Sequence, residues 1–200
     1  MELAKELEFI LTLDKLKNVQ RRNYNLDDTR RENSAEHSWQ VMVLAQIMYP
    51  YAKNKEQIDL FRVMKMLSIH DIVEIDAGDT FVYDEKAMVG KYERELASAK
   101  RIFGILGEPL SAEFLALWEE FESGESADAI FASAVDRIIP FILNAHTSGK
   151  SWREAKVSAE KVRNIVGAAV EKGSEELTEL FEILLQRSID TGKIVHINND

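Results

Sequence analysis

The chain has 200 residues, of which 46% are hydrophobic and 30% charged, and it carries a formal net charge of −10. It contains no cysteine, which excludes disulfides, iron–sulfur clusters and thiolate zinc sites, so any metal must be bound by imidazole and carboxylate groups. The negative charge argues against a nucleic-acid polymer as partner, whereas a small anionic substrate stays compatible because a metal and a few local arginines can override the overall field.

The N-terminal segment does not have the pattern of a targeting signal. Glutamate and lysine interrupt the apolar positions of residues 1–17, so the continuous apolar core of a signal peptide is missing. Nowhere are there 18 consecutive apolar residues, the length that a membrane-spanning helix needs. We therefore expect a cytoplasmic protein with no membrane partner.

Helices dominate the expected structure, because only 9 glycines and 3 prolines interrupt the chain. Apolar residues recur at helical spacing in eight segments: about 2–18, 34–48, 55–72, 90–106, 111–122, 126–145, 151–172 and 174–190. The segment 34–48 is apolar on most faces and is expected to be central. Asn33 or Ser34 can cap it, with Glu36 as the capping-box carboxylate.

Three features separate or interrupt these helices. The polar stretch 21–33 lacks periodicity and is expected to be a loop. Pro140 should kink its helix or start a new segment, and the polar tail 192–200 should fray. These features predict one all-α domain, divided as follows: a single domain over 1–200, with a core at about 16–145, C-terminal helices at 151–190 and the tail at 192–200.

Two of the four histidines lie in unusual surroundings. His37 is in the first turn of a helix that looks buried, and His70 precedes Asp71 at the end of another apolar helix. Such a pair is costly to bury unless it is paired or bound to a metal. A surface dipeptide, or a buried histidine satisfied by its neighbour, explains His70 and Asp71 equally well from these residues alone.

Carboxylates gather downstream of this pair. Glu74, Asp76 and Asp79 follow His70 closely, and Asp136 lies beside Arg137 in an otherwise apolar helix. Asp136 could form a buried ion pair with that arginine, or it could be a metal ligand supplied by a distant helix.

The order of these residues is similar to a known metal-binding motif. A histidine, a His-Asp pair 33 residues later and an aspartate 65 residues beyond that pair resemble the motif of the HD-domain metal-dependent phosphohydrolase superfamily. Three further segments extend the resemblance, to the 5′-deoxynucleotidase and oxetanocin-like branch, over residues 16–140: ENSAEHSWQ, HDIVEIDAGD and VDRIIP. The resemblance implies an all-α HD-domain helical bundle with the metal site between central helices.

The resemblance also implies roles for individual residues. One divalent ion (Mn, Co, Fe, Ni, Zn or Mg) would be held by four ligands: His37, His70, Asp71 and Asp136. Glu74 matches the catalytic glutamate, Asp79 a second acidic residue that orients substrate, and Arg21 the arginine that faces the phosphate. The implied reaction is release of phosphate from ribo- or deoxyribonucleoside 5′-monophosphates by metal-activated water.

The sequence departs from the family pattern beside Arg21. In the bacterial deoxynucleotidases a tryptophan follows that arginine, whereas here Arg22 does. Arg22 could itself be the aligned, substrate-binding arginine, and Tyr24 could replace the aromatic ring. Selectivity for 2′-deoxy substrates is therefore left open.

Alternative functions follow from the same site. One is hydrolysis of a nucleoside triphosphate or another small phosphomonoester, and another is a catalytically silent nucleotide-binding regulator. The resembled family often forms homodimers, and the apolar face of 90–106 is a candidate surface for one. His146 and His196 match nothing in the motif, and Trp118 and Trp152 are expected in the core or at an interface.

Overall fold

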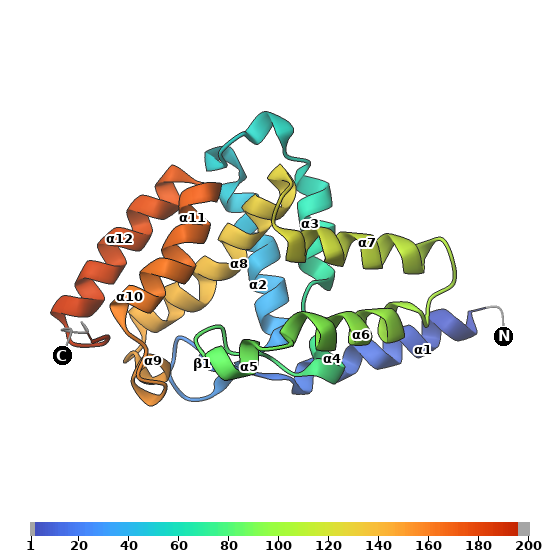
Figure 1. The fold of residues 1–200 in the computed structure, drawn as a ribbon, viewed down its shortest axis with the longest axis horizontal. Helices are drawn as coiled ribbons and strands as arrows, with labels where there is room; N and C mark the ends of the chain where they lie inside the picture. Colours follow the sequence, from blue (N-terminus) through green and yellow to red (C-terminus); the bar gives the residue numbers. More distant parts are fainter. Residues whose placement is uncertain (1–2, 196–200) are drawn as a thin grey trace.

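The structure, a computed structural model, describes residues 3–195 and is helical except for one small hairpin (Figure 1). The helices are α1 (Ala4–Leu13), α2 (Ser34–Met48), α3 (Leu60–Ile69), α4 (Glu74–Ala77), α5 (Glu85–Met88), α6 (Lys91–Phe103), α7 (Leu110–Ser123), α8 (Ala127–His146), α9 (Lys150–Glu154), α10 (Ala159–Val162), α11 (Ala168–Gly173) and α12 (Glu175–Asp190). Two strands, β1 (Gln20–Tyr24) and β2 (Arg31–Asn33), pair with each other. The expected all-α class is confirmed, with the hairpin as an addition.

Helix α8 is the centre of the molecule. It packs against α2, α3 and α7 on one part of its length and against α11 and α12 on another (Figure 1). By length and composition alone it could cross a membrane, but 67% of that apolar window is buried inside the protein, which accounts for its apolar character. The helix continues through Pro140 instead of breaking there. Because proline has no N–H, the carbonyl of Asp136 lacks its usual helical hydrogen bond.

Helix α2 begins as the sequence predicts. The side chain of Asn33 accepts a hydrogen bond from the Glu36 backbone N–H, and the Glu36 carboxylate accepts one from the backbone N–H of Asn33. Its central position is confirmed only in part, because Val41 is buried whereas Trp39 is 64% and Ile47 60% exposed. One face of α2 therefore points inward and the opposite face meets solvent.

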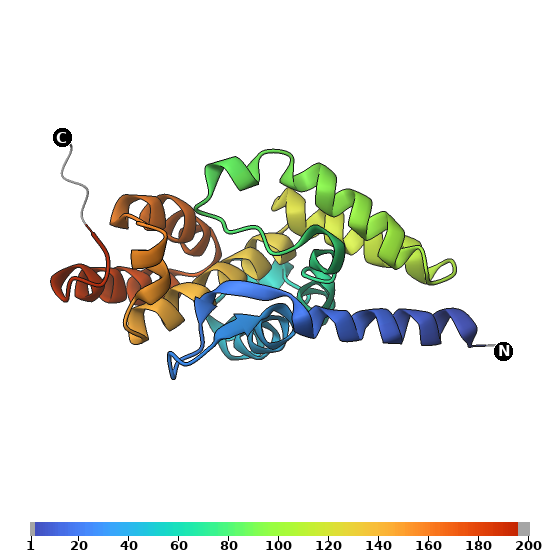
Figure 2. The ribbon, with the colours of Figure 1, turned by 90° about the horizontal axis from the view of Figure 1, so that it is seen from below.

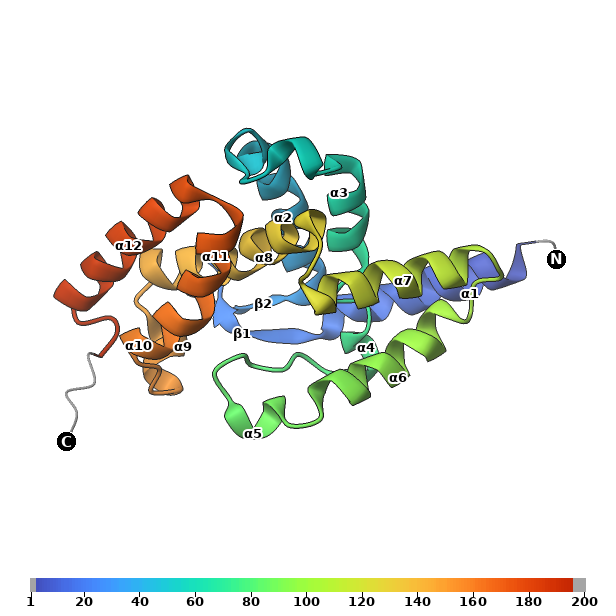
Figure 3. The ribbon, with the colours of Figure 1, turned by 45° about the horizontal axis from the view of Figure 1, so that its top comes forward.

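The prediction of a loop at 21–33 is wrong, because this segment forms most of the β1–β2 hairpin (Figure 3). Gln20 pairs with Asn33 and Tyr24 with Arg31, with an irregular register between them. The hairpin lies against α8 and α9. A strand is normally predicted from alternating apolar and polar residues. Here the buried side chains include the polar Asn23, so the sequence lacks that alternation.

One end of the molecule is formed by α1, α6 and α7, with α1 extending away from the rest (Figure 2). The apolar face of α6, including Ile102 and Phe103, is buried in this cluster together with Trp118. The expectation that this face serves a homodimer is therefore wrong, because the chain's own helices cover it. The homodimer itself stays a prediction.

The C-terminal helices pack against α8 at the other end of the molecule, and Trp152 is buried there as expected. The single helix expected at 151–172 is instead α9 and α10, followed by a π-helical turn at Arg163–Gly167 and α11. The tail does not fray at once, because Ile194 is buried and the Ala159 N–H donates to the Val195 carbonyl. Residues 196–200, with His196, lie outside the described residues.

Candidate metal centre

Three helices bring two histidines and one aspartate together in the core. His37 comes from the first turn of α2, His70 from the residue after α3, and Asp136 from the middle of α8. Their nearest ligand atoms all lie within 4.8 Å of one another. His37 Nε2 is 2.7 Å and His70 Nε2 3.5 Å from the same oxygen, Asp136 Oδ1.

The hydrogen-bonding pattern of the histidines fits a metal ion. His70 Nδ1–H donates to the Leu67 carbonyl over 2.8 Å, which leaves Nε2 as the lone-pair nitrogen. That Nε2 atom is buried and has no hydrogen-bond partner among the described residues. Imidazole and carboxylate together form a donor set suited to first-row divalent metals. The residues present therefore fit the ion that the motif implies.

Asp71 lies next to this trio. Its Oδ1 is 3.1 Å from His70 Nε2, while its Oδ2 accepts a hydrogen bond from Arg21 Nη1 over 2.9 Å. Adjacent side chains of a regular helix point about 100° apart. Helix α3 ends at Ile69, and the chain turns through Asp71, so both side chains can face one point.

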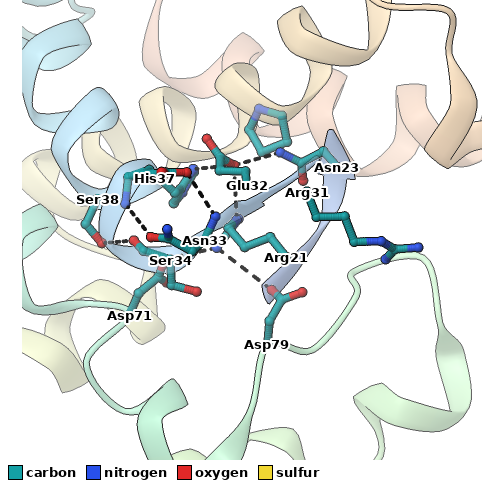
Figure 4. Close-up of polar contacts among 12 residues, drawn as sticks. Arg21, Asn23, Arg31, Glu32, Asn33, Ser34, His37, Ser38, Asp71 and Asp79 are labelled. Carbon is teal, nitrogen blue, oxygen red and sulfur yellow. Dashed lines mark hydrogen bonds and ion pairs between the residues drawn. The ribbon is translucent and has the colours of Figure 1, made fainter. Parts of the chain in front are cut away.

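Arg21, on β1, is enclosed by acidic side chains (Figure 4). Its Nη1 lies 3.9 Å from Glu74 Oε1 and 3.8 Å from Asp79 Oδ1, in addition to its bond with Asp71. Burial alone would lower the pKa of Arg21, but the surrounding carboxylates outweigh burial and raise it. Arg21 is therefore a permanent positive charge among carboxylates that would otherwise repel one another.

Glu32 is a buried site residue that the sequence reasoning did not single out. It is 2% exposed, accepts a 2.7 Å hydrogen bond from Asn23, and lies 3.5 Å from Arg21 Nε (Figure 4). Its Oε2 is also 3.7 Å from His37 Nδ1, on the side of the ring away from Asp136. Glu32 thus places a buried carboxylate beside both Arg21 and His37. Its place in ENSAEHSWQ, five residues before His37, was the available signal.

Glu74 lies within one turn of Asp71, and its Oε2 accepts a 2.5 Å hydrogen bond from the buried Ser34 hydroxyl. Burial, and then the negative charge of Asp71, raises the pKa of Glu74 well above its ordinary value. Burial likewise raises the pKa of Asp79. Asp76 does not join the site, because it binds Arg101 at the surface.

The ligand trio itself is strongly polarised. Burial would lower the pKa of His70, but Asp71 and Asp136 raise it to about 9. Burial would raise the pKa of Asp136, but the hydrogen bond with His37 and the nearby imidazole of His70 hold it well below the usual range. Positive charge at this point is therefore favourable, as a cation site requires.

A cavity opens from the ligands toward α6 and α7. Besides ligand residues it is lined by Lys91, Glu95, Glu122 and Arg137. Lys91 Nζ lies 2.7 Å from Glu95 and 3.2 Å from Glu122. Glu122, at the C-terminal end of α7, therefore belongs to the cavity wall.

A groove leads from this cavity to an outer pocket of about 490 Å³. The groove shares Arg21, Asp79 and Asp136 with the cavity, and it shares Arg22 and Tyr83 with the outer pocket. Both neighbouring arginines line the groove, but Arg21 also lines the inner cavity whereas Arg22 also lines the outer pocket.

Tyr24 and His146 lie away from the ligands. Tyr24 donates to Glu154 at the surface over 3.1 Å. His146 is exposed, and its Nδ1 bonds the Ile142 carbonyl, in agreement with its absence from the motif.

A helical domain with a histidine and aspartate cluster at its centre is the arrangement expected of an HD domain. The family model described as HD domain matches residues 13–178, which is most of the chain. The chain belongs to the HD domain family.

Curated relatives carry the name 5′-deoxynucleotidase HDDC2. The human protein is 30% identical over 132 residues, which cover 66% of this chain and 62% of the human protein. The zebrafish protein (Danio rerio) is 28% identical over 141 residues, covering 70% of this chain and 68% of the relative. The match thus spans a little over three fifths of the human relative's length.

Solved structures extend the similarity to the whole fold. A predicted metal-dependent phosphohydrolase from Magnetospirillum magnetotacticum MS-1 is 41% identical, with a TM-score of 0.89 over 96% of this chain and 98% of that one. An HD-domain phosphohydrolase from Listeria innocua has a TM-score of 0.59 at 14% identity, over 93% of this chain and 86% of that one. The second match supports the fold alone.

Proposed function

We propose that this protein is a metal-dependent phosphohydrolase that releases phosphate from nucleoside 5′-monophosphates. The observation that carries the proposal is the convergence of His37, His70 and Asp136 within 4.8 Å. His70 and Asp136 line a cavity whose wall also includes Arg21 and Glu74. The similarity to proteins named metal-dependent phosphohydrolase and 5′-deoxynucleotidase supports it.

His37, His70 and Asp136 would hold the metal, with Asp71 as the fourth ligand. A divalent cation there supplies Lewis acidity toward the phosphate and lowers the pKa of the attacking water. His70 presents Nε2 because the Leu67 carbonyl fixes the proton on Nδ1. Asp71 divides its two oxygens between the site and Arg21.

Glu74 is suited to proton transfer. Because burial and Asp71 raise its pKa, Glu74 holds a proton more readily than an exposed glutamate does and could give it to the leaving 5′-oxygen. The Ser34 hydroxyl fixes Oε2, which leaves Oε1 turned toward Arg21. Asp79, at the junction of cavity and groove, would orient the substrate. Arg21 would offset phosphate charge through its field while it stays bound to Asp71.

The groove and the outer pocket limit the size of the substrate. A phosphate at the ligands would direct its ester group along Asp79 and Tyr83 toward the outer pocket, whose volume of about 490 Å³ is within the range of small-molecule sites. At the position after Arg21, where the bacterial deoxynucleotidases have a tryptophan, Arg22 lines this path together with Phe81 and Tyr83. We therefore propose nucleosides as the alcohol group, with no assignment of deoxy or ribo preference.

A substrate panel tests the proposal. Purified protein is stripped of metal, reloaded with Mn²⁺, Co²⁺, Fe²⁺, Ni²⁺, Zn²⁺ or Mg²⁺, and assayed with ribo- and deoxyribonucleoside mono- and triphosphates. Inorganic phosphate released from monophosphates by at least one metal form is the expected result. Phosphate release from triphosphates alone would instead indicate a nucleoside triphosphate hydrolase. Tight nucleotide binding without phosphate release would indicate a catalytically silent regulator.

A further inference from the structure

Charge is unevenly balanced in the cavity at the metal centre. Its lining contains three cations, Arg21, Lys91 and Arg137, against six carboxylates: Asp71, Glu74, Asp79, Glu95, Glu122 and Asp136. A phosphate dianion entering this cavity needs a positive charge that is not already neutralised by neighbouring carboxylates.

Two of the three cations are already committed. Arg21 Nη1 is hydrogen-bonded to Asp71 and flanked by Glu74, and its Nε faces Glu32. Lys91 Nζ lies within 3.2 Å of both Glu95 and Glu122. Moving either cation onto a ligand would leave buried carboxylates unpaired, which is costly.

Arg137 is different. Within residues 3–195 its one ion-pair contact joins Nε to Asp136 Oδ2 at 3.7 Å, which is too long for a hydrogen bond, and its side chain is 35% exposed. It lines both the inner cavity and the groove that leads to the outer pocket. Its position directly after Asp136 on α8 holds the guanidinium beside the ligand cluster.

We propose that Arg137 is the phosphate-positioning residue at the open side of the metal centre, binding the anion through the guanidinium nitrogens that carboxylates leave available. The planar guanidinium can make two parallel hydrogen bonds to one phosphate, whereas a lysine ammonium acts as a point charge. This inference rests on the proposed function for its substrate, but phosphate binding by Arg137 is measurable without turnover.

The test compares Arg137→Gln and Arg137→Lys with a matched control, Lys172→Gln. Lys172 shares an outer hollow with Arg137 but does not line the inner cavity. Inorganic phosphate is titrated calorimetrically into each metal-loaded protein, metal content is measured, and KM and kcat are determined with a nucleoside monophosphate.

Arg137→Gln should retain its metal, while its dissociation constant for phosphate and its KM rise by about tenfold or more, the loss expected for a charge-assisted hydrogen bond. Arg137→Lys should recover part of the loss, and Lys172→Gln should match the wild type. Unchanged phosphate affinity and KM in a folded, metal-loaded Arg137→Gln protein would overturn the inference. A wild type that binds phosphate through Arg137 but hydrolyses no nucleotide would instead remove the proposed function and keep the inference.

Discussion

His37 Nε2 lies 2.7 Å from Asp136 Oδ1, although 99 positions separate the two residues in the chain. The contact joins the start of α2 to the middle of α8, and both side chains are buried. His70 Nε2 lies 3.5 Å from the same oxygen, so three side chains from distant parts of the chain meet at one point.

Removal of one ligand should empty the site. His70→Ala deletes the nitrogen that the Leu67 carbonyl orients, and we expect bound metal and phosphatase activity to fall together by about 100-fold or more. Asp71→Ala should behave in the same way. Elemental analysis and phosphate release are measured on the same preparations. The exposed His146→Ala is the control, and full activity in the His70 or Asp71 variant would remove that residue from the ligand set.

Glu74 should separate metal binding from turnover. Glu74→Ala is expected to keep its metal while kcat falls by about 10²- to 10⁴-fold, the usual contribution of a positioned proton donor. Asp76→Asn is a matched control two residues away, because Asp76 pairs with Arg101 at the surface. A Glu74→Ala enzyme with wild-type kcat would end the catalytic assignment.

The raised pKa of Glu74 also predicts a pH effect on stability in the metal-free protein. Because the folded-state pKa exceeds the unfolded value of about 4.5, the protonated carboxyl stabilises the fold at low pH, and that stabilisation is lost as pH rises through the folded pKa. Glu74→Gln cannot ionise, so its Tm should exceed that of the wild type by a margin that grows above pH 4.5. Glu93→Gln, on the exposed face of α6, is the control. A margin that does not change with pH would contradict the shift.

Glu32 should be important for stability as well as for orientation. Glu32→Ala leaves the buried amide of Asn23 without its acceptor and removes the carboxylate beside Arg21 and His37. We expect the free energy of unfolding to fall by about 3–5 kcal/mol, as for other broken buried pairs. Arg163→Ala breaks an exposed ion pair with Glu182 and should cost no more than about 1 kcal/mol. Equal losses in urea denaturation would show that Glu32 has no special role.

The sequence was informative where apolar periodicity and capping chemistry act locally. The Asn33–Glu36 capping box and the span of α2 were predicted because short-range contacts determine both. The hairpin was not, because its buried side chains, such as Asn23, are polar and are satisfied only by partners in the folded state. The split of 151–172 into shorter helices was likewise invisible in its periodicity.

The same division applies to the site. His37, His70 and Asp136 could be proposed from their order, but only the fold shows that their ligand atoms meet. Arg21 could be expected near phosphate, whereas its enclosure by Asp71, Glu74 and Asp79 depends on where the hairpin lies. Arg137 followed the predicted ligand directly and was interpreted only as a possible ion-pair partner.

The most direct test of the account is a metal titration of the stripped protein, with binding followed by calorimetry and phosphate release from a nucleoside monophosphate followed in parallel. The account predicts one divalent ion per chain and activity that rises with occupancy and disappears on chelation. Full phosphate release by metal-free protein, or tight binding of one ion by a protein lacking both His37 and His70 side chains, would contradict it.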